Sequence, residues 1–205
     1  MSTVTTAIHR CAVSITVVIA LSCAVPDVTA PTDDDHVRGP ATVKLTLIEY
    51  GDYQCPPCVI SFDVVEKVLA RHPSDLRFVY RHHPGRRHRN AIPAAKAAEA
   101  AERQGKFWEM HRALFEGQKE WYGSPRPQVI FERYARALHL DFPQFAEAYE
   151  SPGLENRLRK IFEAGQDVGV RGSPAFFLNG KRLVPPPTTE ADLERAIIAA
   201  TRNTG

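Results

Sequence analysis

The chain alternates between segments with a period of two and segments with a helical period, which predicts a mixed α/β fold. From residue 43 to residue 50 apolar side chains such as Val43, Leu45 and Leu47 share one face, as in a half-buried strand. Residues 59–69 carry apolar side chains at helical spacing, and residues 76–80 form a second strand-like run. A strand, a helix and a strand of these lengths predict parallel strands joined by a right-handed crossover.

The next part of the chain is predicted to contain helices alone. Helices are expected at 94–104, 106–116, 128–138, 142–150 and 154–168. Asn90, Asp141 and Ser151 are the candidate caps of three of them.

Strand character returns near the C-terminus. It is expected at 175–178 and at 181–184, around the hairpin signal Asn179-Gly180. A final helix is predicted at 190–201. The pattern therefore predicts a split α/β domain at 43–205, with a helical subdomain inserted at about 86–168.

The N-terminal segment is typical of an export signal. Arg10 precedes an apolar run at 11–25 and then small residues, and the run is shorter than the roughly 20 residues of a bilayer span. Signal cleavage after Ala30, lipid attachment at Cys23 and retention as a membrane anchor stay open. We expect residues 1–30 to be a signal peptide, 31–42 to be a flexible leader, and the protein to act outside the cytoplasm.

Composition narrows the class of partner, and the cysteines suggest a chemistry. The 26 basic and 24 acidic residues nearly balance, so nothing favours nucleic acid as a partner.

Beyond residue 30 the chain has two cysteines, Cys55 and Cys58. A bridge between them closes a tiny loop and adds little stability. At a helix start, however, the backbone N–H groups stabilise a thiolate, the reactive species in disulfide exchange. This placement favours a redox function over the alternative, half of a zinc site.

Several segments together resemble the DsbA-like branch of the thioredoxin superfamily. They are Ile-Glu-Tyr-Gly-Asp-Tyr-Gln-Cys-Pro-Pro-Cys at 48–58, the alanine-rich 94–102, Gln-Gly-Lys-Phe-Trp-Glu-Met-His at 104–111, and Val-Arg-Gly-Ser-Pro at 170–174, which leads into 176–180. The resemblance implies an α/β thioredoxin fold with an inserted helical cap. It also implies thiol–disulfide oxidoreductase activity on exported proteins, with a redox-active Cys55–Cys58 disulfide and no separate cofactor.

The resemblance also implies roles for individual residues. Cys55 is the expected nucleophile and Cys58 the resolving thiol. The Ser173–Pro174 bond is expected to be cis and to lie beside the cysteines, where the Ser173 backbone can pair with an extended client. Glu49 is expected to be buried near Cys58 and to pass protons during exchange, the alternative being an exposed residue at a strand end.

The direction of exchange depends on the residues between the cysteines. These are Pro56 and Pro57, which carry no charge and donate no N–H, whereas the DsbA type has a histidine there. We therefore expect an intermediate redox potential, oxidation of exported proteins, and recycling by a membrane redox partner. The alternatives are a reductase or isomerase kept reduced by such a partner, and a metal carrier that uses the cysteines with nearby histidines.

Three further groups of residues invite interpretation. The basic run 81–89 is expected to be a solvated loop, although it could also lower the pKa of Cys55, attract acidic partners or hold a metal. The aromatic segment 107–111 is predicted to pack in the core. Trp121, Tyr122 and Phe131 are candidates for an apolar surface that meets unfolded clients.

Overall fold

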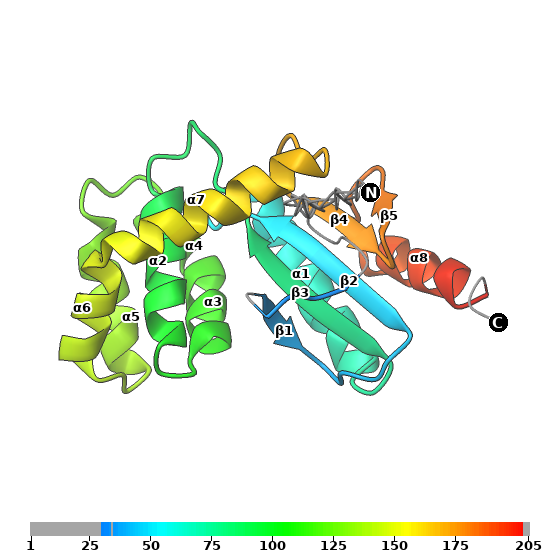
Figure 1. The fold of residues 1–205 in the computed structure, drawn as a ribbon, viewed down its shortest axis with the longest axis horizontal. Coiled ribbons are helices and arrows are strands. Elements are labelled where there is room, and N and C mark those ends of the chain that lie inside the picture. Colours follow the sequence, from blue (N-terminus) through cyan, green and yellow to red (C-terminus); the bar gives the residue numbers. More distant parts are fainter. Residues whose placement is uncertain (1–29, 34, 203–205) are drawn as a thin grey trace, which may run out of the picture.

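The computed structural model describes residues 30–33 and 35–202, and a mixed sheet lies at its centre (Figure 1). The strands of this sheet, in chain order, are β1 (His36–Arg38), β2 (Leu45–Gly51), β3 (Leu76–His82), β4 (Ala175–Leu178) and β5 (Lys181–Leu183). Their spatial order is β1-β3-β2-β4-β5. The expected crossover is confirmed, because β2 and β3 are parallel and α1 (Pro56–Arg71) connects them.

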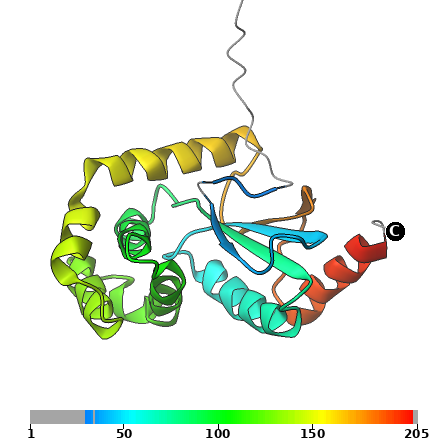
Figure 2. The same ribbon diagram turned by 60° about the horizontal axis from the view of Figure 1, so that its bottom comes forward.

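Both faces of the sheet are covered, since β2 is buried along its whole length. On one face Leu47 packs in the same core cluster as residues of α1 and of α8 (Glu190–Arg202). On the other face Tyr50 packs close to Gly165 of α7 (Pro152–Asp167). Figure 2 shows α7 running over that side of the sheet. Gly165 permits this approach, because a Cβ there would lie 2.9 Å from the Tyr50 ring. The sheet is therefore the middle layer of a three-layer arrangement.

The helices between β3 and β4 gather beside the sheet, and α7 runs back over it (Figure 1). They are α2 (Ala91–Glu102), α3 (Phe107–Glu116), α4 (Gln118–Trp121), α5 (Pro127–Ala137), α6 (Phe142–Glu150) and α7. The four-residue α4 was not predicted from the sequence. Nine of the twelve residues of the alanine-rich α2 are buried, because small side chains let neighbouring helices approach it from several sides.

The predicted helix caps have mixed outcomes. Asp141 caps α6 as expected, by accepting a hydrogen bond from the backbone N–H of Gln144 at 2.8 Å. Asn90 and Ser151 occupy the N-cap positions of α2 and α7 as predicted, but neither side chain makes a capping hydrogen bond. The Asn90 amide instead donates to backbone carbonyls near the end of α4.

Part of the segment expected to be a flexible leader belongs to the sheet. Residues 36–38 form β1, which pairs antiparallel with β3. The neighbouring Asp35 forms a buried ion pair with Arg81, 2.6 Å between Arg81 Nη2 and Asp35 Oδ2. This contact helps to hold the start of β1 against the edge of the sheet.

Two other surface predictions also need correction. Arg81, His82 and His83, expected in a solvated loop, are buried. Trp121 and Phe131 are fully buried and contact each other edge to face, so they form no client surface. Tyr122, in contrast, is 42% exposed.

The core prediction for 107–111 is confirmed by the burial of Phe107, Met110 and His111. The expected export signal, with Cys11 and Cys23, falls outside the described residues apart from its last residue. Among the residues that are described, no helix combines the length and the apolar character needed to cross a membrane.

Candidate redox site

The two cysteines lie at the N-terminus of α1. Cys55 is the N-cap residue and the helix begins at Pro56, so the predicted place of the cysteines at a helix start is confirmed. Pro56 and Pro57 fit the first turn because their missing N–H groups would have had no helical partner. Both cysteines are free thiols, and the backbone N–H of Cys58 donates to the Cys55 carbonyl at 3.0 Å.

The two sulfur atoms have different surroundings. Cys58, at the head of the apolar stripe of α1, is fully buried. Cys55, at the helix cap, keeps only 5% exposure. A hydrogen bond from the Cys58 thiol lowers the pKa of Cys55 to about 6. Burial opposes this shift, and hydrogen bonds from the Cys58 backbone and the Ser173 side chain add to it. Burial raises the pKa of Cys58 well above its usual value. At neutral pH the site therefore holds one thiolate, on Cys55.

The loop before β4 lies against the reactive cysteine. Cys55 Sγ lies 3.3 Å from the Ser173 backbone carbonyl oxygen, to which the thiol donates when it is protonated. The Ser173–Pro174 peptide bond is cis, as expected. A second cis bond, Val184–Pro185, was not predicted. Ser173 and Pro174 therefore lie next to the cysteine at which exchange would begin.

Glu49 lies on β2 and is 2% exposed, so its predicted burial is confirmed. Its Oε1 atom has no hydrogen-bond partner among the described residues. Burial, with a smaller effect of the Cys55 charge, raises the pKa of Glu49 to about 8. The Glu49 charge in turn raises the pKa of Cys58. A neutral carboxyl coupled to a buried thiol can donate and accept a proton near pH 7.

A sequence model of the family described as Thioredoxin matches residues 31–199. The chain belongs to the thioredoxin family.

Solved structures with the thioredoxin fold resemble the whole domain. A thioredoxin-like oxidoreductase from Silicibacter pomeroyi is 26% identical with a TM-score of 0.70, over 83% of this chain and 94% of that chain. BdbD from Bacillus subtilis is 20% identical with a TM-score of 0.73, over 82% of this chain and 94% of that one. Wolbachia pipientis alpha-DsbA1 is 16% identical with a TM-score of 0.74, over 85% of this chain and 96% of that chain. The predicted fold, that of DsbA-like thiol–disulfide oxidoreductases, is confirmed.

Curated relatives include much longer proteins that contain a similar segment. The Na(+)/H(+) antiporter NhaA 3 of Salinispora tropica is 40% identical over 169 residues, which are 82% of this chain and 25% of the antiporter. The NhaA 1 antiporter of Mycolicibacterium vanbaalenii is 38% identical over 173 residues, 83% of this chain and 27% of that protein. The chain thus spans about a quarter of the first antiporter's length.

Asp52 holds the turn that leads into the cysteines of this thioredoxin fold, and sequence reasoning missed it. Its Oδ1 accepts from the Gln54 N–H at 2.8 Å, and its Oδ2 accepts from the Gly85 N–H at 2.8 Å. The His88 ring also contacts Oδ2. The local signal was available, because an Asp that accepts from the N–H two residues later is typical of an Asx-turn.

Amide side chains attach the same turn to the helical insertion. Gln118 donates to the Tyr53 carbonyl at 2.7 Å. Gln54 donates to the Tyr122 carbonyl at 2.8 Å and accepts from the Asn90 N–H at 2.6 Å. These contacts link residues distant in sequence, so no motif could have revealed them.

A thiolate titration tests this description of the cysteines. We expect the ultraviolet absorbance of the thiolate in the reduced chain to rise with a midpoint near pH 6, and Cys55→Ser to remove that step. Cys58→Ala should raise the midpoint, because it removes the hydrogen bond that stabilises the Cys55 thiolate. A wild-type midpoint at the usual thiol pKa of about 8.5 would contradict the described hydrogen bonding.

Proposed function

We propose that the chain is a thiol–disulfide oxidoreductase that oxidises dithiols of exported proteins through Cys55 and Cys58. The single observation that carries this proposal is the unequal cysteine pair. One thiol has a pKa of about 6 beside the Ser173 carbonyl, and the other is fully buried. Disulfide exchange through these two cysteines needs no separate cofactor.

The proposed reaction begins with the Cys55–Cys58 disulfide. A client thiolate attacks Cys55 Sγ, the bond between the two cysteines breaks, and Cys58 leaves with the electron pair. Glu49 supplies the proton that Cys58 then takes up, because its raised pKa keeps the carboxyl protonated at neutral pH. The product is a mixed disulfide between Cys55 and the client.

The second step completes the transfer of two electrons. The second client thiolate attacks the client sulfur of the mixed disulfide, and Cys55 leaves as a thiolate. The low pKa of Cys55 makes it a good leaving group and stabilises the dithiol form of the protein. A stabilised dithiol form supports oxidation of the client as the favoured direction. Pro56 and Pro57 add no charge to the site, which supports an intermediate redox potential.

We also propose where the client binds and how the reduced cysteines are oxidised again. We place the client main chain against Ser173 and Pro174, where an extended peptide can approach Cys55. After each cycle the dithiol must be oxidised again, and a membrane redox partner outside the cytoplasm is the proposed oxidant. The sequence of residues 1–30 supports an exported site of action.

A single-turnover experiment tests the proposed activity. The full chain, oxidised at Cys55 and Cys58, is mixed with a reduced dithiol peptide, and both products are alkylated and weighed by mass spectrometry. We expect one peptide disulfide for each chain reduced. Equilibration with glutathione should then give a potential less negative than the roughly −270 mV of thioredoxin. A peptide that stays reduced contradicts the proposal. A redox potential at or below that of thioredoxin would make reduction of the client, and not its oxidation, the favoured direction.

A further inference from the structure

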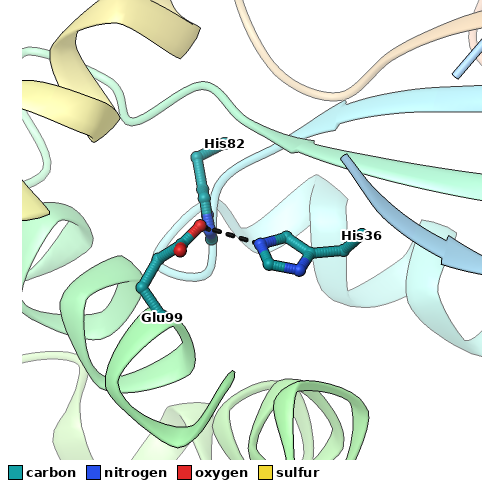
Figure 3. Close-up of side chains that lie close together, drawn as sticks. All are labelled: His36, His82 and Glu99. Atoms are coloured by element: carbon teal, nitrogen blue, oxygen red, sulfur yellow. Dashed lines mark hydrogen bonds and ion pairs between the residues drawn. The ribbon is translucent and has the colours of Figure 1, made fainter. Parts of the chain in front are cut away.

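Two histidines and a glutamate from three separate elements meet in a buried cluster beside the sheet (Figure 3). His36 comes from β1, His82 from the end of β3 and Glu99 from α2. Their side chains point toward one another, with 2.8 Å from His36 Nε2 to Glu99 Oε1 and 3.1 Å from His82 Nε2 to the same oxygen. All three residues are less than a tenth exposed.

We propose that His36, His82 and Glu99 bind a divalent transition-metal cation, with Zn²⁺ as the best chemical match. Their ligand atoms all lie within 4.8 Å of one another, so a small adjustment lets one ion contact all three. Two imidazole nitrogens and one carboxylate oxygen form a ligand set typical of zinc and of other first-row divalent ions. In the proposed complex the ion replaces the hydrogen bonds between the ligands, and water can complete its coordination.

The rings are held in the orientation that binding requires. The His36 ring stacks on Phe107 with 3.4 Å between ring centroids and an interplanar angle of 8°. The His82 ring lies edge to face against Phe107 at 5.9 Å and against Tyr80 at 5.5 Å. Both Nε2 atoms therefore face the same carboxylate oxygen before any ion arrives. This reduces the conformational entropy lost on binding.

The surrounding charges are compatible with an added cation. Arg157 donates to Glu99 Oε2 at 3.0 Å, which leaves Oε1 facing the histidines. Glu102 Oε2 lies 3.9 Å from His36 Nδ1 and offers a second negative charge. The Glu99 carboxylate thus faces the cation and the Glu102 carboxylate lies behind the His36 ring, against the one guanidinium of Arg157.

The proposed site shares His82 with the basic run that the sequence offered for metal binding, but it differs from the metal carrier considered there, because neither Cys55 nor Cys58 belongs to the cluster. Its expected effect is structural. An ion held by β1, β3 and α2 would fasten the edge strand and the helical insertion to the sheet. Binding to the folded state alone raises the thermal midpoint, by about 5–10 °C when the free metal is a hundredfold above its Kd.

The test uses the full chain with Cys11, Cys23, Cys55 and Cys58 replaced by serine, so that no thiolate can bind metal. After incubation with Zn²⁺ and dialysis, we expect one equivalent of zinc by elemental analysis and a raised thermal midpoint. With Co²⁺ as the probe, we expect a visible spectrum without a thiolate charge-transfer band. If the cysteine-free chain binds neither Zn²⁺ nor Co²⁺ at micromolar metal concentration, the proposal is overturned. Binding that occurs only when the cysteines are present overturns it as well.

Substitutions then assign the ligands. In the cysteine-free chain, His36→Gln and Glu99→Gln should each weaken Zn²⁺ binding at least about a hundredfold, because each removes a direct ligand. The matched control is His72→Gln at the end of α1, outside the cluster, which should leave binding unchanged. Equal affinity in His36→Gln and in the control overturns the site. If a ligand variant does not fold, the NMR signals of the His36 and His82 rings are followed in the cysteine-free chain. Signals that do not shift when Zn²⁺ is added overturn the site as well.

Discussion

Cys55→Ser should lower disulfide exchange to the uncatalysed rate, because serine cannot form the mixed disulfide through which the electrons pass. Cys58→Ser should give a different result. Its remaining thiol can attack a client disulfide, with a serine hydroxyl in place of the Cys58 thiol as hydrogen-bond donor, but no second thiol is present to release the client. Incubation of this variant with an oxidised client should therefore accumulate a covalent complex, measured on non-reducing gels and by intact mass.

The matched control is Cys23→Ser, which changes a cysteine outside the described residues. It should keep wild-type turnover and trap no client, because Cys55 and Cys58 remain in place. Wild-type turnover in both active-site variants would rule out the proposed exchange. A covalent complex with Cys55→Ser in place of Cys58→Ser would reverse the two assigned roles.

Glu49→Gln should change how the stability of the reduced chain depends on pH. The carboxyl titrates near 4.5 in the unfolded chain and near 8 in the folded one. Between these values the folded state holds a proton that the unfolded state has released, so the free energy of unfolding falls as pH rises. The difference in pKa corresponds to a loss on the order of 5 kcal/mol once the pH exceeds 8. Urea unfolding at a series of pH values measures it.

The glutamine variant should lack this component, so its stability relative to the wild type should improve steadily from pH 4.5 to 8. Glu116→Gln, at an exposed position on α3, is the control and should follow the wild-type curve. If Glu49 is also the proton donor to Cys58, exchange by Glu49→Gln should slow by about a hundredfold. Parallel stability curves for wild type and Glu49→Gln would show that the carboxyl titrates normally.

Local sequence signals predicted those parts of the fold that depend on local geometry. The hairpin at Asn179-Gly180 is an example, because both residues have positive φ angles, 47° and 77°, as a tight hairpin turn requires. The strand-helix-strand unit was equally readable from its periodicity. The Cys55 and Cys58 positions followed from the same local pattern, since a helix start fixes which thiol heads the buried stripe.

Long-range contacts produced the features that the sequence did not reveal. β1 has three residues, too few for periodicity, and exists because β3 offers an edge to pair with. The basic run was misread for a similar reason. Its first residues continue β3, and Arg81 is buried against Asp35, a partner 46 residues away. The unpaired oxygen of Glu49 likewise depends on the packing around it and not on neighbours in the chain.

The amide contacts of Gln54, Asn90 and Gln118 have a consequence for how this protein would lose activity. The turn that carries Cys55 is held from outside the sheet, by groups in and around α2 and α4. Partial unfolding or proteolytic nicking of those helices would therefore displace the reactive sulfur while the strands stayed intact. Inactivation under mild heat or protease should accordingly precede the loss of strand structure.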